Sequence, residues 1–417
     1  MIMAINYPLK KLRVGFIGSG FIGYFHLQAM IGVRNVEING VYSPTPANRE
    51  KLARAVINAE LGQCKAHASL ESLLQAPDVD AIWILSPNFT RLEVMQTINR
   101  MVKRGESNIV AVACEKPLAR TLADAREMLR LAEDANLNHG YLENQVFCTP
   151  VLRGKEIIWR RAAATTGRPY LARAAEEHSG PHEPWFWRGD LQGGGVLSDM
   201  MCHSVEVARF MLTEPGQPRD SLRLKTANGT VASLKWTRPN YVKRLKDMMG
   251  SEVDYSKRPA EDFARALLTL EDPNGAELVI ESTTSWAYVG PGLRIQLELL
   301  GPEYAMEFSS LNTGLKIFMS REVKGDQGED LVEKQNAEQG LMPVLDDEPS
   351  VYGYVDENRH MVECFRKGQT PIETFYDGVA VVEILMALYR SAELGELVKM
   401  PCPELETYIP PVARTET

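Results

Sequence analysis

Three glycines near the N-terminus constrain the fold more than any other feature of this sequence. The segment GFIGSGFIG places Gly18, Gly20 and Gly23 after a short apolar run, LRVGFIG, and at the start of a segment with helical spacing, FIGYFHLQAMI. Glycines allow a tight turn from a strand into a helix, and they let the backbone of that turn approach a ligand closely. The pattern therefore predicts a strand, a turn and a helix over residues 12–31.

Strands and helices continue to alternate after this unit. The β-rich runs VEINGVYS, DAIWILS, NIVAVACE and NHGYLEN are separated by helical segments, among them those near residues 90–103 and 121–135. Such alternation is typical of a parallel, doubly wound sheet. We therefore expect an α/β fold whose N-terminal part, residues 1–149, is a Rossmann dinucleotide-binding domain.

The pattern changes after Pro150. One more helix is expected there, and from Tyr170 onward strands follow one another with little helix between them, the last being GLKIFMS. This favours a C-terminal α+β domain over residues 150–417 with a large, mostly antiparallel open sheet, for substrate binding and oligomerisation. The helices at about 353–397 are expected to pack back toward the Rossmann domain. Charged stretches at 241–258 and 325–349 are expected to be surface excursions.

Composition excludes several classes of protein. The 417 residues suit two domains, and the formal net charge of -9 without a dense basic cluster argues against nucleic-acid and membrane-surface partners. Six scattered cysteines lack disulfide or metal-ligand spacing, so we expect free thiols and no metal site. With no signal peptide and no window long enough to span a membrane, a cytoplasmic protein is expected.

The glycine turn predicts a nicotinamide dinucleotide as cofactor. Its pyrophosphate would lie at the helix N-terminus, where free N–H groups and the helix dipole favour anions. The alternative is a glycine turn that binds no ligand. The second strand ends in Val-Tyr-Ser-Pro-Thr and offers no acid to the adenosine ribose. Hydroxyls of Ser43 and Thr45, with Arg49 nearby, can receive either a ribose or a 2′-phosphate, so NAD and NADP both stay open.

Two further motifs carry polar groups suited to catalysis. Glu115-Lys116-Pro117 follows the expected strand NIVAVACE, at the edge where a doubly wound sheet exposes its ligand crevice. Lys116 can hydrogen-bond a substrate hydroxyl there. In GGGVLSDMMCHS, Asp199 and His203 are four residues apart and share one helix face. The alternatives are a solvated loop for the first motif, and a helix-capping Asp with a buried His for the second.

GFIGSGFIG, CEKPL and GGGVLSDMMCH occur in the order and spacing of one known family. The chain resembles the glucose-fructose oxidoreductase, inositol dehydrogenase and MocA superfamily (Gfo/Idh/MocA) over nearly its whole length, the tail from residue 353 included. The resemblance implies an NAD(P)-dependent oxidoreductase that oxidises a secondary hydroxyl of a sugar, polyol or glycoside. It also implies a homodimer or homotetramer formed through the C-terminal sheet.

The resemblance also assigns roles. Lys116 or His203 relays the proton of the hydroxyl, and Asp199 orients the sugar and the histidine. One departure concerns the segment after Ser86-Pro87-Asn88, where many relatives carry a histidine and this chain has Phe-Thr-Arg91. The implied cofactor-binding residues are Gly18, Gly20, Phe21, Ile22, Gly23, Ser43, Arg49, Ser86, Asn88, Glu115 and Lys116.

Candidate substrate-binding residues lie in two segments. The first is EEHSGPHEPWFWRGD, whose aromatic faces suit sugar C–H surfaces and whose polar groups suit hydroxyls; the alternative is a loop held by aromatics at a subunit interface. The second is GYLENQVF, where Glu143, Asn144 and Gln145 are polar and Tyr141 is expected in the core. The substrate-binding candidates are His178, His182, Trp185, Trp187, Arg188 and Asn144.

Two other functions remain open at this point. In a redox glycosidase, bound NAD oxidises a ring hydroxyl, the aglycone is eliminated, water adds and the cofactor is restored; some members of the superfamily work in this way. A non-catalytic NAD(P)-sensing protein is disfavoured because Lys116, Asp199 and His203 are all present.

Overall fold

The computed structural model describes residues 11–319, 340–345 and 347–414, and these form two compact units. The first contains the described residues up to Ala119 together with Ala123–Cys148 and Tyr352–Val379. The second contains Arg120–Leu122 and the described residues of 149–351 and 380–417. No helix in these described ranges combines the length and hydropathy that a membrane span needs.

The first unit is built on a six-stranded parallel sheet in the order β3-β2-β1-β4-β5-β6. Its strands β4 and β5 are buried at every residue, as expected for a parallel sheet covered on both faces. This strand order is that of the Rossmann fold. The strands are β1 (Leu12–Ile17), β2 (Val36–Tyr42), β3 (Lys65–His67), β4 (Ala81–Ile84), β5 (Ala111–Glu115) and β6 (Asn138–Leu142).

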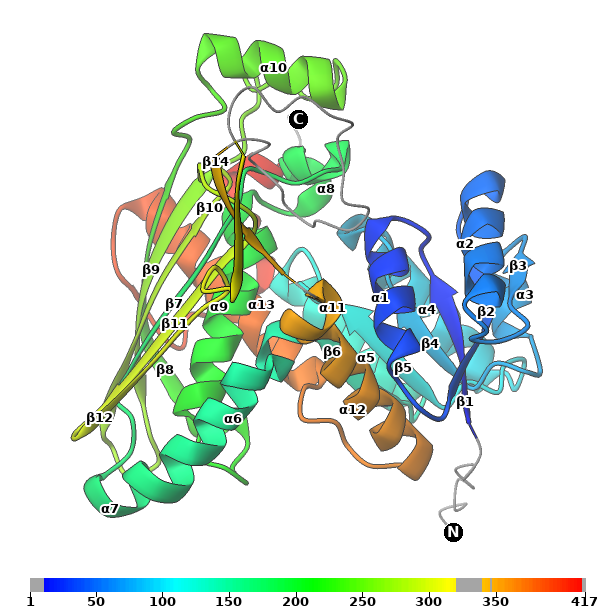
Figure 1. Cartoon of the computed structure of the whole chain (residues 1–417), viewed down its shortest axis with the longest axis horizontal. Helices are drawn as coiled ribbons and strands as arrows, with labels where there is room; N and C mark the ends of the chain where they lie inside the picture. The colour runs from blue at the N-terminus through cyan, green and yellow to red at the C-terminus, as the bar shows by residue number, and fades with distance from the viewer. Residues whose placement is uncertain (1–10, 320–339, 346, 415–417) are drawn as a thin grey trace. The chain divides into compact units, whose positions relative to one another are not determined.

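A helix from the far end of the sequence completes this unit. Helix α12 packs against α1 and also contacts β1 and β6 (Figure 1, orange and dark blue). Acidic residues in its first turn, basic residues in its last and Gly368 in a left-handed conformation at its end all favour a helix with these limits. The helices are α1 (Phe21–Ile31), α2 (Pro46–Asn58), α3 (Leu70–Leu74), α4 (Arg91–Lys103), α5 (Leu122–Asp134) and α12 (Tyr354–Lys367), with short 3-10 turns η1 (Asn88–Thr90) and η2 (Asn144–Phe147).

The second unit is built on a seven-stranded sheet in the order β12-β11-β7-β10-β9-β8-β15. All neighbours are antiparallel except β7 and β10, and buried and more exposed residues alternate along the strands, so one face forms the core. The strands are β7 (Leu171–Glu177), β8 (Arg223–Ala232), β9 (Phe263–Glu271), β10 (Glu277–Ser285), β11 (Arg294–Gly301), β12 (Tyr304–Ser309) and β15 (Val398–Lys399). The predicted α/β class with a parallel and a mostly antiparallel sheet is confirmed.

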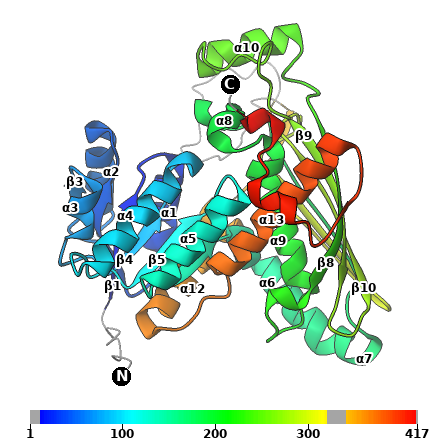
Figure 2. The same cartoon turned by 180° about the vertical axis from the view of Figure 1, so that it is seen from behind.

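Helix α9 lies along β7, β9 and β10 on the buried face of this sheet (Figure 2). All of its residues from Val196 to Leu212 are buried, which agrees with its apolar composition. The unit also contains α6 (Thr149–Ile157), a π-helical continuation η3 (Ile158–Ala163), α7 (Ala164–Thr166), α8 (Gly189–Gln192), α10 (Pro239–Met249) and α11 (Glu348–Val351), with short turns at η4 (Pro184–Trp187), η5 (Arg219–Ser221), η6 (Pro403–Thr407) and η7 (Pro411–Ala413). Helix α13 (Phe375–Leu394) lies mostly in this unit.

The structure corrects two of the sequence predictions, and part of a third lies outside the described residues. The stretch expected as an excursion at 241–258 contains most of α10, which buries Val242 and Leu245. GLKIFMS does not join the large sheet, because β13 (Leu315–Met319) pairs with β14 (Gly340–Val344) in a separate two-stranded sheet. Residues 325–339 and 346 of the second excursion lie outside the described residues.

Candidate active site

The glycine turn joins β1 to α1, and each glycine has its own steric reason. Gly18 has φ +117°, and a Cβ on it would lie 2.6 Å from the carbonyl oxygen of Leu85. A Cβ on Gly23 would lie 3.1 Å from the Gly18 carbonyl oxygen, so this position permits close packing of the helix on the turn. A Cβ on Gly20 would meet no atom within 4 Å. Gly20 therefore leaves open space at the turn, whereas glycines at positions 18 and 23 avoid clashes within the turn.

The N-terminus of α1 fits a phosphate group. Its N-cap is Gly20, no side chain caps it, and no acidic residue lies in its first turn. A helix N-terminus carries a partial positive charge, which favours an anion. Together with the open space at Gly20, this arrangement fits a dinucleotide pyrophosphate at the backbone of Phe21 and Ile22.

The end of β2 holds the residues predicted at the adenosine ribose. The Arg49 guanidinium donates hydrogen bonds to the carbonyl oxygens of Ser43 (3.1 Å) and Pro44 (3.4 Å). Ser43 is buried and Thr45 is the N-cap of α2. Arg49 therefore lies beside the strand end predicted to receive either a ribose or its 2′-phosphate.

Arg91, the departure noted in the sequence, has a defined position in the first unit. Its buried guanidinium donates to the carbonyl oxygens of Ser86 (2.9 Å), Glu115 and Pro117. It thus ties the end of β4 to the turn that carries Lys116. Burying a guanidinium is costly unless its N–H groups are paired, and these three acceptors supply that pairing.

The Glu115-Lys116-Pro117 motif follows β5, as predicted. The Lys116 side chain is half-buried, and its peptide bond to Pro117 is cis. Glu115 is buried, and its two oxygens accept hydrogen bonds from His26 Nε2 (2.8 Å) and from the Lys116 backbone N–H (3.0 Å). Burial acts to raise the pKa of Glu115, but the His26 hydrogen bond and the nearby cationic groups lower the pKa below its usual value.

The polar segment after β6 is buried. Asn144 donates to the Tyr352 carbonyl oxygen (2.7 Å), and Glu143 accepts from the Gln145 backbone N–H (3.3 Å). Tyr141 is fully buried, which confirms its predicted place in the core. In the same unit Ser86 accepts a hydrogen bond from Thr90, and Asn88 is buried in the turn η1.

Two of the three glycines before α9, Gly194 and Gly195, make room for a carboxylate and a phenol that contact each other. Glu261 Oε1 accepts from the N–H groups of Gly195 (2.9 Å) and Leu197 (3.2 Å). The Tyr389 hydroxyl donates to the same oxygen (2.5 Å) and accepts from the Gly195 N–H (3.0 Å) and the Ser198 N–H (3.1 Å). These two side chains cap the start of the helix, which has no N-cap side chain of its own.

There is no room for side chains at this cap. A Cβ on Gly194 would lie 2.0 Å from the Tyr389 hydroxyl, and one on Gly195 would lie 2.5 Å from the Glu261 carbonyl oxygen. Burial raises the pKa of Glu261, and burial together with Glu261 raises the pKa of Tyr389 well above its usual value. The glycines therefore let buried groups reach the backbone of α9 one turn before Asp199.

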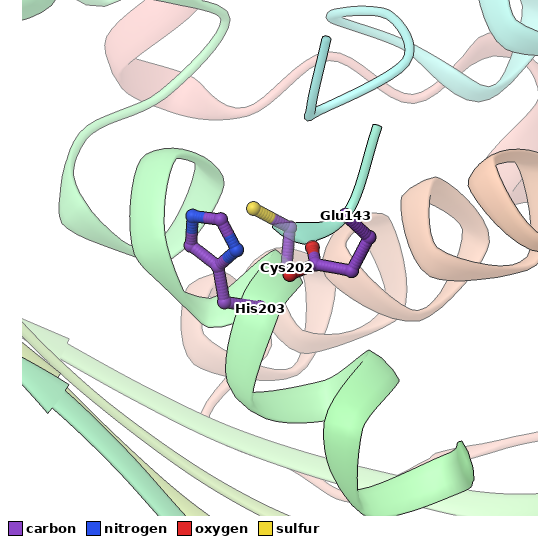
Figure 3. Close-up of side chains that lie close together, drawn as sticks. All are labelled: Glu143, Cys202 and His203. Atoms are coloured by element: carbon purple, nitrogen blue, oxygen red, sulfur yellow. The ribbon is translucent and has the colours of Figure 1, made fainter. Parts of the chain in front are cut away.

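Asp199 and His203 lie on α9, and both side chains are buried. Asp199 Oδ2 accepts a hydrogen bond from the indole N–H of Trp286 (3.2 Å), and its position in the first turn suits a negative charge. His203 Nε2 lies 3.9 Å from Glu176 Oε2. Figure 3 shows His203 and its neighbour Cys202 projecting from α9, and it also labels Glu143 of the segment after β6.

The residues of the aromatic segment 178–188 belong to the same unit but differ in burial and in their contacts. Trp187 is only 2% exposed, donates to the Pro181 carbonyl oxygen (3.1 Å) and packs on Trp286, with ring centroids 5.2 Å apart. Trp187 thus packs against Trp286, whose indole N–H donates to Asp199. Trp185 stacks on Phe186 and is half-buried.

The polar candidates of this segment have different surroundings. His178 is buried, and its Nδ1 accepts from the Gly180 N–H (2.9 Å), whereas His182 is exposed. Arg188 forms ion pairs with Asp190 and Glu252. Substrate contacts of these residues and of Asn144 stay predictions.

Sequence reasoning missed several groups that hold the candidate residues in place. Trp286 ends a predicted strand and Tyr389 lies within a predicted apolar helix, so neither stands out from its surroundings. Glu261 precedes a strand in an acidic segment and carries no motif. His26 offered the one usable signal, since it is the only imidazole in the apolar segment FIGYFHLQAMI.

A parallel sheet in Rossmann order, with a glycine turn that opens onto an uncapped helix, defines the class of dinucleotide-binding proteins. Comparison with known proteins narrows this class. The sequence model of the oxidoreductase family with an NAD-binding Rossmann fold matches residues 12–140, and that of the GFO/IDH/MocA C-terminal domain matches residues 160–303. The chain belongs to the Gfo/Idh/MocA oxidoreductase family, and its N-terminal domain is an NAD-binding Rossmann domain.

Individual relatives are distant. The rhizopine catabolism protein MocA of Rhizobium meliloti is 27% identical over 242 residues, which are 58% of this chain and 68% of that protein. The 1,5-anhydro-D-fructose reductase of Ensifer adhaerens is 31% identical over 223 residues, 52% of this chain and 61% of the reductase. The levoglucosan dehydrogenase of Pseudarthrobacter phenanthrenivorans is 26% identical, over 49% of this chain and 52% of its own length.

Solved structures match over most of the chain. A protein from gentamicin A biosynthesis in complex with NAD superposes with a TM-score of 0.74 at 22% identity, covering 94% of this chain and 97% of that one. Levoglucosan dehydrogenase in complex with NADH and levoglucosan superposes with a TM-score of 0.69 at 20% identity, covering 94% and 100%. At these identities the likeness shows the fold.

Proposed function

We propose that this protein is an NAD(P)-dependent oxidoreductase that transfers hydride between the nicotinamide and a secondary hydroxyl of a sugar, polyol or glycoside. The observation that carries the proposal is the helix α9, which holds a buried acid and a buried histidine one turn apart and is capped from outside by Glu261 and Tyr389. Such an arrangement presents two polar groups with little freedom to move. The names of the relatives, which include sugar and inositol dehydrogenases, support the substrate class.

Each residue has a role in this proposal. The nicotinamide, when bound, accepts or returns the hydride. Lys116 hydrogen-bonds the reacting hydroxyl, and Lys116 or His203 takes up its proton as a general base. Asp199, held by the Trp286 indole, orients the sugar and the histidine. Gly20 leaves the start of α1 open to the pyrophosphate, and Gly18 and Gly23 permit the tight turn that precedes it. Ser43, Arg49, Ser86 and Asn88 are the proposed contacts to the rest of the cofactor.

The test follows reduced nicotinamide by its absorbance with a panel of sugars, polyols and glycosides, using NAD and NADP separately. Lys116→Ala, Asp199→Ala and His203→Ala should each lower turnover by about a hundredfold, because proton transfer or orientation is lost. Cofactor affinity should change little in all three. Gly20→Val, which fills the open space at the turn, should instead abolish cofactor binding in a fluorescence titration.

Free aglycone is assayed in parallel with the glycosides. Release of aglycone with no net reduced cofactor would replace this proposal with a redox glycosidase. Normal turnover of any of the three alanine variants would remove that residue from the mechanism.

We further propose that the protein forms a homo-oligomer through the outer face of the seven-stranded sheet. That face carries Arg173 of β7, which pairs with Glu281 of β10 (2.7 Å) and with Glu298 of β11 (3.0 Å). Sedimentation velocity tests this, and a monomer at micromolar concentration would contradict it.

A further inference from the structure

A chain of buried hydrogen bonds in the first unit leads from the core of the sheet to the turn that carries Lys116. Trp83 Nε1 on β4 donates to Asn358 Oδ1 on α12 (3.0 Å), and the Asn358 side chain contacts His26 Nδ1 on α1. His26 Nε2 contacts Glu115 Oε1 (2.8 Å), and Glu115 Oε2 accepts the backbone N–H of Lys116 (3.0 Å). The three side chains of Trp83, His26 and Asn358 are completely buried.

The indole of Trp83 decides how the Asn358 amide is oriented. An indole N–H can only donate, so the atom of Asn358 that faces it must be the oxygen. The amide nitrogen then donates to the Tyr354 carbonyl oxygen (2.8 Å), which can only accept. In the opposite orientation the amide NH2 group would face the Trp83 N–H, and the amide oxygen would face the Tyr354 carbonyl oxygen. Both neighbours therefore select the same orientation of the amide.

This orientation in turn selects the protonation of His26. The Asn358 Nδ2 lies 3.0 Å from His26 Nδ1, closer than Oδ1 at 3.2 Å. A proton on Nδ1 would point toward the amide hydrogens, so Nδ1 serves as an acceptor. The ring then carries its proton on Nε2, where it donates to Glu115.

The carboxylate at the end of this chain is thereby held on both oxygens. Oε1 receives the imidazole N–H and Oε2 receives the N–H of Lys116, so neither rotation nor translation of the group is free. Arg91 holds the same turn through the carbonyl oxygens of Glu115 and Pro117. A base or hydrogen-bond donor works best when its backbone and the groups behind it are fixed.

We propose that His26 is a positioning residue for Lys116, acting as the neutral Nε2–H tautomer that Asn358 selects and Glu115 receives. The inference rests on the proposed function in one respect, namely that Lys116 contacts the substrate. Through His26, helix α12 influences the geometry of the turn after β5 that carries Lys116. No substrate, cofactor or proton passes through His26 itself.

The first experiment reads the tautomer and needs no activity. The full-length protein is labelled with ¹⁵N-histidine, and long-range ¹⁵N–¹H correlation spectra are recorded at neutral pH, with the His26→Gln variant identifying the signal. We expect a protonated Nε2 and an unprotonated Nδ1 for His26. A proton on Nδ1, alone or together with Nε2, would overturn the proposal.

The second experiment separates positioning from packing. His26→Gln keeps an N–H donor near Glu115, whereas His26→Leu removes the donor at similar volume. We expect the Leu variant to lose about tenfold or more in kcat with little change in KM for the cofactor, and the Gln variant to recover most of kcat. Equal kcat in wild type and the Leu variant, or equal losses in both variants, would contradict a positioning role.

His139→Leu serves as the matched control. His139 lies on β6 of the same unit, stacks on Phe375 and accepts the Phe375 N–H, and its hydrogen bonds among the described residues do not involve Glu115 or Lys116. It should lose stability without a comparable loss in kcat. If the wild type reduces neither cofactor with any compound of the panel, the proposed function fails while the NMR result still decides the tautomer.

Discussion

Glu357 offers the sharpest test of the electrostatics in the first unit. It follows Gly353 by one helical turn in α12 and is completely buried, and neither of its carboxyl oxygens has a hydrogen-bond partner among the described residues. Burial, followed by the charges of Glu115 and Glu143, raises the pKa of Glu357 well above its ordinary value of 4.5. The folded protein therefore keeps this proton at pH values where an exposed glutamate has released it.

The sign of its effect on stability follows from proton binding. Below its ordinary pKa, Glu357 is protonated in both states and has no effect on the pH dependence. As the pH rises above that value, the unfolded chain releases the proton and the folded protein keeps it. The unfolded state then binds fewer protons, so the free energy of unfolding falls with pH.

The size of the effect can be stated per pH unit. One proton corresponds to about 1.4 kcal/mol per pH unit, so each pH unit between the ordinary pKa and the raised pKa of Glu357 lowers the free energy of unfolding by about that amount. Glu357→Gln removes this dependence because an amide does not titrate. The variant should therefore gain stability relative to wild type, progressively, as the pH rises above about 5.

The measurement is urea unfolding of both proteins at several pH values. A difference in the free energy of unfolding that is the same at every pH reports the effect of burying an amide. Only a difference that changes with pH comes from the titration of Glu357. Glu363→Gln on the same helix is the control. Partial burial acts to raise the pKa of Glu363, but hydrogen bonds from Asn35 and Lys367 lower it below its usual value. Above about pH 5 the Glu363→Gln variant should therefore differ from wild type in the free energy of unfolding by an amount that does not change with pH. Parallel curves for wild type and Glu357→Gln would refute the reasoning.

Three further substitutions test hydrogen bonds of buried side chains, the first two of them at the candidate site. Tyr389→Phe removes the acceptor of the Ser198 N–H and should lower the free energy of unfolding by about 2 kcal/mol in urea titrations. Arg91→Met leaves buried carbonyl oxygens at the Lys116 turn unpaired, and should lower the melting temperature by several degrees in calorimetry. Asp262→Asn keeps one acceptor oxygen where two now receive three backbone N–H groups, at a cost of about 2 kcal/mol measured by the urea midpoint. Unchanged stability in any of the three would show that its hydrogen bonds are replaced by water.

Local patterns in the sequence were sufficient to predict the architecture. A strand buried on both faces is uniformly apolar, and a glycine turn before a helix has few alternative uses, so the parallel sheet and its cofactor turn could be recognised without any tertiary information. The same holds for the spacing of Asp199 and His203, which places both on one helix face. The C-terminal strands were recognisable from their alternation, but the partner of β13 was not, because alternation identifies the buried face and carries no information about the neighbouring strand.

The supports of the candidate site required the folded chain. Tyr389 reaches the start of α9 across 194 residues of sequence, and Asn358 reaches His26 across 332. Hydrogen bonds of this kind depend on positions in space, and a single sequence records only which residue types are present. Periodicity can indicate that Glu357 and Asn358 lie in a helix, whereas their burial, and with it the pKa of one and the orientation of the other, follows from the strands and helices that surround them.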